Sequence, residues 1–203
     1  MLKRAFDIFF SAGALVVLSP LMIAVALWVK KDSPGPVFFR QRRVGRNGRE
    51  FEIFKFRTMR VDAPARGLQI TVGTDARITS SGMFLRKYKI DEFPQFINVV
   101  LGDMSVVGPR PEVPRYVAMY PEAARATVLS VRPGITDLAS IEYRDENELL
   151  GRSGDAEQTY IEVVMPAKLS YCERYVRERS FLGDLRIIKR SFVAAFAHRP
   201  RGG

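Results

Sequence analysis

The sequence predicts an α+β fold: a mostly helical cytosolic domain with one β-hairpin, preceded by a re-entrant membrane segment of helix, break and helix. Three observations predict it. A long apolar run occupies the N-terminus, two segments rich in strand formers flank an Asn-Gly pair, and later segments, above all 181–197, place apolar residues at helical spacing. We expect a membrane hairpin over 1–31 and one cytosolic domain over 32–203, with amphipathic helices at the membrane interface.

The composition is basic. Lys and Arg number 32 against 22 Asp and Glu, which gives a formal charge of +10 and favours an anionic partner. Nucleic acid, anionic lipid and nucleotide substrates all satisfy this preference. The single cysteine, Cys172, excludes an internal disulfide framework and fits a reducing compartment. His198 is the only histidine, so histidine-based catalysis is not expected.

The N-terminal segment has the length of a membrane helix. Residues 8–29 are 22 consecutive uncharged, mostly apolar residues, enough to cross a bilayer core of about 30 Å. The run is too long for a cleaved signal peptide and no small-residue cleavage site follows it. Lys3 and Arg4 precede it, and Lys30 and Lys31 follow it. Because basic flanks favour the cytoplasmic side, both ends are expected there.

A Ser19-Pro20 pair lies near the middle of this run. Proline removes a backbone donor and serine can bond the freed carbonyl, so a sharp bend is expected. Each arm, 8–19 and 20–29, then covers only half of the hydrocarbon thickness at about 1.5 Å per residue. We therefore expect a re-entrant hairpin with Asp7 and the neighbouring basic residues at the membrane interface. The alternative is an ordinary kinked transmembrane helix.

A β-hairpin is expected after the helix-breaking segment 33–36. Segments 37–41 and 51–56 are rich in strand formers and flank the turn at 45–48, which contains Asn-Gly. Lys55 and Arg57 would share one face of the second strand, where they can approach a phosphate. A solvated basic face is an equally good interpretation.

The remaining elements follow from caps, breakers and periodicity. They are an irregular loop over 61–79, a helix capped by Ser80 or Ser81 and running to about Tyr88, a helix from the N-cap Asp91 to Leu101 ended by Gly102, a charged solvated helix face over 142–148, a helix over 166–175, and a basic amphipathic helix over 181–197. The last of these can pack on the core or lie on an anionic membrane.

The acidic pair Asp91-Glu92 is the first candidate site. Capping alone would explain Asp91 but not Glu92 beside it, nor the basic residues just upstream. A helix N-terminus favours the charged carboxylate, so Asp91 is expected to be ionised near neutral pH. An ionised aspartate can attack phosphorus or bind magnesium.

Two arginine-containing turns form the second candidate site. Prolines on both sides of Arg110 restrict its backbone, and its guanidinium can bind a phosphate through two hydrogen bonds. A rigid turn with an incidental arginine is the alternative. The later Arg132-Pro133-Gly134 can frame a nucleotide or merely turn the chain.

Several ordered motifs together resemble the bacterial sugar transferases called monotopic phosphoglycosyl transferases, over nearly the whole chain. They are the basic-flanked apolar segment with Ser19-Pro20, Lys55-Phe56-Arg57-Thr58-Met59, Asp91-Glu92-Phe93-Pro94-Gln95, Gly102-Asp103-Met104-Ser105, Gly108-Pro109-Arg110-Pro111 and Arg132-Pro133-Gly134-Ile135-Thr136. In length the chain is similar to the minimal members, which lack the additional transmembrane helices of larger relatives.

The resemblance implies a reaction. Such enzymes move a sugar 1-phosphate from a UDP-sugar to undecaprenyl phosphate, release UMP, require Mg²⁺ and begin glycoconjugate assembly at the bacterial inner membrane, with the catalytic domain on its cytoplasmic face. It implies that Asp91 is the nucleophile, forms a covalent phosphosugar intermediate and binds the metal, and that Glu92 is a second catalytic carboxylate. The candidates for holding the diphosphate or the lipid phosphate are Lys55, Arg57, Arg86, Arg110 and Arg132.

By the same resemblance the partners are a UDP-sugar, undecaprenyl phosphate and membrane lipid, and not nucleic acid. The chain departs from the commoner pattern at Asp137, where many members have glycine. This departure is expected to leave the chemistry unchanged, and the sugar stays undefined. A rival from another class is a non-catalytic, membrane-attached basic module that binds anionic lipid, in which Asp91 is only a helix cap.

Overall fold

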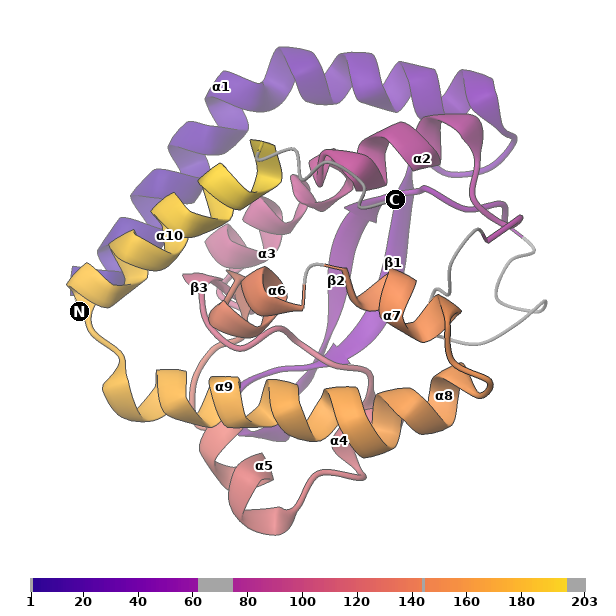
Figure 1. The fold of residues 1–203 in the computed structure, drawn as a ribbon. Coiled ribbons are helices and arrows are strands. Elements are labelled where there is room, and N and C mark those ends of the chain that lie inside the picture. The colour runs from indigo at the N-terminus through magenta and orange to yellow at the C-terminus, as the bar shows by residue number, and fades with distance from the viewer. Residues whose placement is uncertain (1, 62–74, 144, 197–203) are drawn as a thin grey trace.

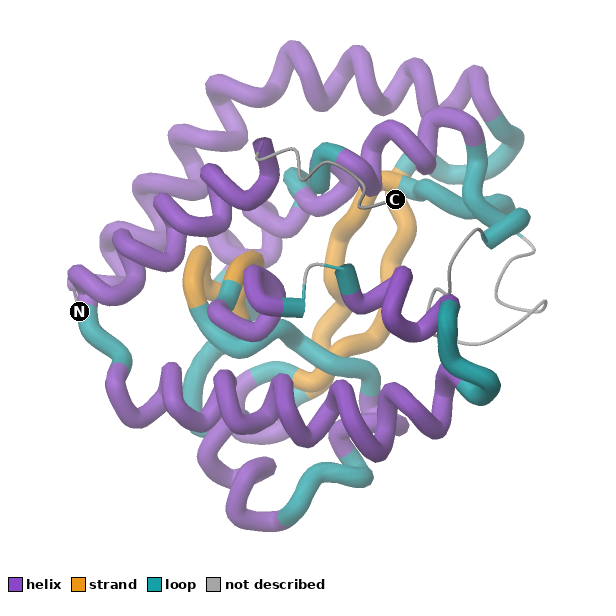
Figure 2. The backbone as a smooth tube through the Cα atoms, viewed as in Figure 1, coloured by secondary structure: helices purple, strands orange, loops and turns teal. Residues whose placement is uncertain are grey.

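The computed structural model describes residues 2–61, 75–143 and 145–196, with side chains through Ala194 (Figure 1). Helices dominate this part of the chain, and its strands form two small sheets of two strands each. The strands lie in the middle of the molecule in Figure 2, with helices around them. The predicted mostly helical α+β class is confirmed, with one long apolar helix at the N-terminus.

The elements follow one another in this order. They are α1 (Leu2–Asp32), β1 (Phe38–Val44), the 3₁₀ turn η1 (Arg46–Gly48), β2 (Glu50–Phe56), α2 (Ser80–Lys87), the 3₁₀ turn η3 (Ile90–Glu92), α3 (Gln95–Leu101), β3 (Ser105–Val107), α4 (Pro114–Val117), α5 (Glu122–Val128), β4 (Gly134–Thr136), α6 (Leu138–Glu142), α7 (Glu146–Gly151), α8 (Ala156–Thr159), the π-helical turn η4 (Tyr160–Val164), α9 (Met165–Glu178) and α10 (Phe181–Phe196).

Helix α1 runs for 31 residues through Pro20 without interruption. Pro20 has no N–H for the carbonyl of Val16, and the Ser19 hydroxyl donates to that oxygen instead at 2.7 Å. In Figure 1 the helix rises along one edge of the molecule and then turns across the top. The serine hydroxyl therefore bonds the freed carbonyl as predicted, and the backbone stays helical across the pair, so α1 does not show the predicted break. By length and composition α1 can cross a membrane.

The N-terminal end of α1 is bound to the rest of the domain. Lys3 forms an ion pair with Asp184 of α10. Asp7 accepts hydrogen bonds from the Ser105 hydroxyl at 2.8 Å and from the Val106 N–H at 3.1 Å, both in β3. With only 2% of its surface exposed, Asp7 lies in the protein interior.

The other end of α1 is held by Arg57, which follows strand β2. Its guanidinium donates to the backbone carbonyls of Val29, Ser33 and Pro34 at 3.3, 2.6 and 2.9 Å. Val29 lies in the last turn of α1, and Ser33 and Pro34 follow directly after the helix. Both ends of α1 are therefore fastened to the same folded domain.

The predicted β-hairpin is confirmed. Strands β1 and β2 are antiparallel, with Phe38 opposite Phe56. Asn47 and Gly48 have φ of 58° and 76°, the left-handed conformations that Asn-Gly turns adopt readily. The free edge of β2 is covered by the Asn98 carboxamide, which accepts from the Phe54 N–H at 2.9 Å and donates to a strand carbonyl at 2.7 Å. This pairing places α3 directly beside β2.

The start of α3 differs from the prediction. Asp91 is not its N-cap but lies in the 3₁₀ turn η3, and α3 begins after Pro94 without a side-chain cap. Gly102 ends the helix with φ of 103°, as predicted. The Asp91 carboxylate is consequently free of a capping role. The predicted serine cap of α2 is also wrong, because Thr79 caps that helix.

A short parallel pair, which the sequence did not reveal, joins β3 to β4, with Ser105 opposite Gly134. The backbones approach closely: a Cβ on Gly134 would lie 2.1 Å from the Gly108 nitrogen. Only glycine fits such a contact. Strand β4 thus begins at Gly134, directly after Arg132 and Pro133, and it lies against the turn that carries Arg110.

The two C-terminal helices extend over the predicted ranges with small shifts. In α10, Asp184 and Ile187 face the interior, whereas Phe192 is 67% exposed. The apolar face predicted for this helix is therefore only partly covered by protein. In the loop predicted over 61–79, residues 62–74 lie outside the described part, and Met59 bridges to Ile78. The charged segment predicted over 142–148 falls at the end of α6 and in α7.

Candidate active site

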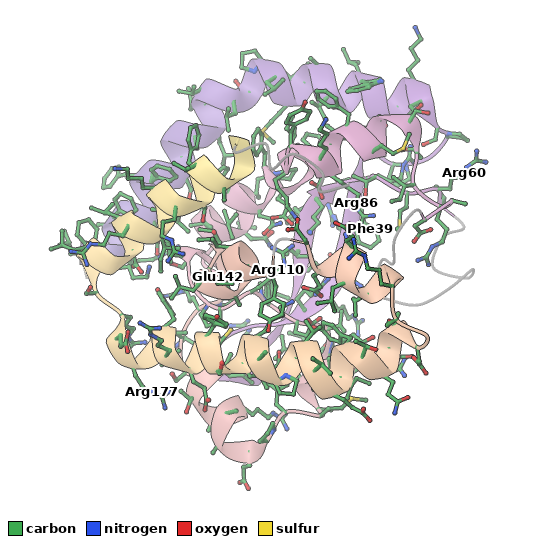
Figure 3. All side chains as sticks on the ribbon, in the orientation of Figure 1. Phe39, Arg60, Arg86, Arg110, Glu142 and Arg177 are labelled. Atoms are coloured by element: carbon green, nitrogen blue, oxygen red, sulfur yellow. The ribbon has the colours of Figure 1, made fainter. Side chains whose placement is uncertain are left out.

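The acidic pair meets two of the predicted basic residues in the interior. Lys55, from β2, lies with its Nζ 2.9 Å from Oε1 of Glu92. Arg110, from the turn after β3, contacts the same Oε1 through Nη2 and lies 3.3 Å from Oε2 through Nη1. Asp91 and Glu92 are 6% and 9% exposed. In Figure 3 Arg110 lies inside the ring of helices, whereas Arg177 projects from the outer edge of α9.

Glu92 is held in its charged form. Burial by itself would raise the pKa of its carboxyl, but the charges of Arg110 and Lys55 outweigh burial and hold that pKa well below its usual range. Burial in turn lowers the pKa of Lys55, and the negative charge of Glu92 opposes this shift. The three side chains form one buried, hydrogen-bonded charge cluster, in which Glu92 is fully engaged.

Asp91 has a different environment although it is adjacent in sequence. Burial raises the pKa of its carboxyl, the charge of Lys55 opposes the rise, and the nearby Glu92 adds to it. The expectation that a helix N-terminus stabilises its charge is therefore not met. Its Oδ1 is buried and has no hydrogen-bond partner among the described residues. An uncompensated buried oxygen is costly to a fold, so Asp91 is the member of the pair that stays open to a ligand.

The other predicted phosphate ligands divide into two groups. Arg86, in α2, interacts electrostatically with Asp91: burial lowers the pKa of Arg86 and the Asp91 charge opposes this. Arg57 and Arg132 are not brought to the pair. Arg57 binds the end of α1, and the Nε of Arg132 donates to the carbonyl of Gly102 at 2.8 Å.

The sequence reasoning missed one polar residue that contacts the site. Asp137 is 2% exposed and accepts from the backbone N–H of Arg110 at 3.1 Å. Gln95, the first residue of α3, is 1% exposed, and both atoms of its amide lack hydrogen-bond partners in the described part of the chain. No sequence signal could have paired Asp137 with Arg110, because that contact depends on the parallel pairing of β3 with β4.

A second cluster supports the Arg110 turn from the opposite side. Arg43 of β1 donates to the Pro111 carbonyl at 3.0 Å and to Glu112 at 3.1 Å. Tyr160, in the π-helical turn, donates its hydroxyl to the other oxygen of Glu112. Burial and the charge of Glu112 raise the pKa of Tyr160, so its hydroxyl stays protonated as a donor. The turn is thereby fixed by backbone as well as side-chain contacts.

Comparison with known proteins shows the family of this chain. The model of the bacterial sugar transferase family matches residues 1–198. The chain belongs to the bacterial sugar transferase family. It is 40% identical over 164 residues to the UDP-N-acetylgalactosamine-undecaprenyl-phosphate N-acetylgalactosaminephosphotransferase of Aeromonas hydrophila, covering 80% of the chain and 37% of that protein.

Two further relatives extend the comparison. The UDP-glucose:undecaprenyl-phosphate glucose-1-phosphate transferase of Escherichia coli (strain K12) is 36% identical over 202 residues, which are 98% of this chain and 41% of that protein. The exopolysaccharide production protein PSS of Rhizobium leguminosarum bv. phaseoli is 46% identical over 149 residues, covering 70% and 74% of the two chains. The chain thus spans 37% and 41% of the first two relatives.

The carboxylates of the acidic pair fit a particular kind of metal binding. Among the described residues no group of three His, Cys, Asp or Glu side chains is arranged to hold a metal. Asp91 nevertheless offers a buried oxygen without a partner, whereas Glu92 is occupied by Lys55 and Arg110. Mg²⁺ commonly binds through one or two carboxylates and completes its shell with substrate phosphates and water. The residues fit an ion that is shared with a diphosphate substrate.

Proposed function

We propose that this chain is a phosphoglycosyl transferase that moves a sugar 1-phosphate from a UDP-sugar to undecaprenyl phosphate, giving undecaprenyl-diphosphate-sugar and UMP. The observation that carries the proposal is the buried, unpartnered Oδ1 of Asp91 beside a Glu92 that two cations neutralise. The printed names of the Aeromonas and E. coli relatives, which specify UDP-sugar donors and undecaprenyl phosphate, support this choice of substrates.

In the first step Oδ1 of Asp91 attacks the phosphorus that bears the sugar. A bond forms between Asp91 and phosphorus while the bond to the bridging oxygen breaks, and UMP leaves with the electron pair of that bond. In the second step a phosphate oxygen of undecaprenyl phosphate attacks the same phosphorus and releases Asp91. Two displacements at one carboxylate divide a difficult reaction between large anions into easier steps.

The basic residues offset the negative charge of this reaction. Because Glu92 stays ionised, it serves as a fixed anchor for Arg110 and Lys55 and not as a proton donor. Arg86 adds a third cation near Asp91. Mg²⁺, held by Asp91 and the diphosphate, would neutralise the phosphate oxygens and the leaving group. This arrangement makes the site attractive to a diphosphate and lowers the electrostatic repulsion between the substrate and the Asp91 carboxylate.

We also propose that α1 enters the cytoplasmic membrane of the bacterium as a re-entrant hairpin and returns to the same face. Lys3 and Asp7 fasten its first turns to the domain, and Arg57 fastens its last turn. A straight crossing would separate these attachments across the bilayer. Between them, apolar side chains such as Phe9 and Val17 are 78% and 77% exposed, as lipid contact requires. The basic flanks favour the cytoplasmic side.

Cysteine labelling tests this topology. Leu2→Cys and Lys31→Cys are made separately with Cys172 replaced by serine, since Cys172 is the only native cysteine. A membrane-impermeant maleimide is applied to right-side-out and inverted vesicles. Labelling of both positions in inverted vesicles alone is the expected result. Labelling of the two positions from opposite faces would refute the hairpin.

The reaction is tested by UMP release. Detergent-solubilised protein is incubated with undecaprenyl phosphate, Mg²⁺ and a panel of UDP-sugars. At least one sugar nucleotide is expected to give continuous UMP release that depends on the lipid and disappears in Asp91→Asn. A non-catalytic lipid-binding module would release none, and a hydrolase would release sugar phosphate without the lipid. Either outcome would reject the proposal.

A further inference from the structure

Asp137 holds two backbone segments with the two oxygens of one carboxylate. Oδ1 accepts the N–H of Ser140 at 2.7 Å and so caps α6. Oδ2 accepts the N–H of Arg110 at 3.1 Å. The thiol of Cys172 lies 3.8 Å from Oδ2 and completes a buried environment. Capping needs only one of these oxygens, so the contact with Arg110 requires a separate explanation.

The contact lies where the chain has little freedom. Gly108 donates its N–H to the Thr136 carbonyl at 3.1 Å, and Gly134 donates to the Pro109 carbonyl at 3.0 Å. These bonds align the end of β3 with the end of β4, directly before Arg110 and Asp137. The guanidinium of Arg110 then reaches Glu92 on the far side of the turn. Asp137 thus contacts the backbone of Arg110, whose side chain forms the ion pair with Glu92.

We propose that Asp137 is a positioning residue for the transferase reaction: its carboxylate fixes the backbone of Arg110 so that the guanidinium reaches both oxygens of Glu92. The expected effect of Asp137 on turnover rests on the proposed function. Its effect on the backbone of Arg110 does not. It assigns a role to the residue at which the chain departs from the commoner family pattern.

Hydrogen exchange tests the structural part without any substrate. Pro109 and Pro111 have no N–H, so Arg110 carries the only exchanging backbone amide between Gly108 and Glu112. Asp137→Ala removes its hydrogen-bond acceptor and is expected to speed exchange at Arg110 at least tenfold. Asp137→Asn keeps one acceptor oxygen for two N–H groups and is expected to give an intermediate rate.

Asp155 provides a matched control. It caps α8 as Asp137 caps α6, accepting the N–H of Gln158 at 2.9 Å, but it is exposed. Asp155→Ala therefore loses a helix cap of the same type and is expected to leave both exchange at Arg110 and turnover unchanged. An equal effect of Asp137→Ala and Asp155→Ala would reduce Asp137 to a helix cap and overturn the proposal.

A double-mutant cycle tests the kinetic part. Asp137→Ala is expected to lower kcat/KM about tenfold in the native protein but less than threefold in an Arg110→Lys background. In that background the guanidinium that Asp137 positions is already absent. If Asp137→Ala does not fold, Asp137→Asn takes its place in the cycle. Equal losses in both backgrounds would overturn the proposal, as would unchanged exchange at Arg110. Absence of UMP release by the native protein would reject the proposed function alone, because the exchange result would stand.

Discussion

Arg110 and Glu92 form a two-bond ion pair, with Nη2 on Oε1 and Nη1 3.3 Å from Oε2. The two residues come from different segments, the turn after β3 and the turn before α3, and Lys55 joins them from β2. This pairing separates the roles of the acidic residues. Glu92 is saturated by cations and ionised, whereas Asp91 keeps a buried oxygen without a described partner.

Replacing Arg110 by lysine tests the importance of the two-bond contact between its guanidinium and Glu92. A lysine keeps the charge but cannot bind both oxygens of Glu92 in a fixed plane. Arg110→Lys is expected to lower kcat/KM by about 10- to 100-fold, measured as UMP release, while the fold is retained. Arg177→Lys is the control, because Arg177 is exposed on the outer edge of α9 (Figure 3). Equal activity of the two variants would contradict the account.

Asp91→Asn is expected to abolish turnover and to raise the unfolding temperature at neutral pH. The folded pKa of Asp91 lies above its ordinary value of 3.8, so the ionised form costs stability. This cost is absent below pH 3.8, grows as pH rises through the folded pKa, and is fully present above it. Asparagine never ionises, so its advantage over the native protein should vanish in acid. Thermal unfolding of both proteins across pH measures the difference in unfolding temperature. An Asp91→Asn variant that unfolds at a lower temperature than the native protein at pH 7 would disprove the prediction.

Glu92→Gln is expected to have the opposite effect on stability. The folded pKa of Glu92 lies well below its ordinary value of 4.5, so its pairs stabilise the fold fully above that pH and are lost as pH falls through the folded pKa. Removing one partner of a buried ion pair should lower the free energy of unfolding at pH 7 by about 3 kcal/mol. Denaturant unfolding at pH 7 and in acid tests this prediction. The difference in free energy of unfolding between the native protein and Glu92→Gln should shrink in acid.

Arg57→Ala distinguishes a structural arginine from a substrate ligand. Arg57 is 4% exposed and donates to carbonyls at the end of α1. Its removal is expected to lower the free energy of unfolding by about 2 kcal/mol or more and to leave the KM for the UDP-sugar within twofold. Lys55→Ala is the comparison, with an expected rise in KM or loss of kcat. A tenfold rise in KM for Arg57→Ala with unchanged stability would assign it to the substrate.

Local patterns predicted much of the fold. Asn47-Gly48 placed the hairpin turn, Gly102 ended α3, and Ser19-Pro20 marked the altered hydrogen bonding of α1. Each of these features depends on a backbone requirement that one or two residues satisfy by themselves. The β3–β4 pair was not predictable in this way, because its strands are three residues long and their pairing depends on a contact between two distant glycines.

The site was predictable in its residue types and less so in its geometry. Asp91, Glu92, Lys55 and Arg110 were chosen from chemistry and motif order, and Lys55 and Arg110 both form ion pairs with Glu92, which is adjacent to Asp91. The predicted cap at Asp91 was wrong because a 3₁₀ turn precedes α3, with the Phe93 N–H bonded to the Ile90 carbonyl. Guanidinium groups bind whichever carbonyls or carboxylates the packing presents, so the partners of such arginines cannot be read from a strand pattern.

Intact mass spectrometry during turnover is the most direct measurement of the central claim. The solubilised protein is mixed with its UDP-sugar and Mg²⁺ in the absence of undecaprenyl phosphate, quenched and weighed. The account predicts a mass increase of one sugar phosphate, located by digestion to Asp91, lost on addition of undecaprenyl phosphate and absent from Asp91→Asn. A protein that releases UMP continuously with the lipid present, but never carries this adduct on Asp91, would contradict it.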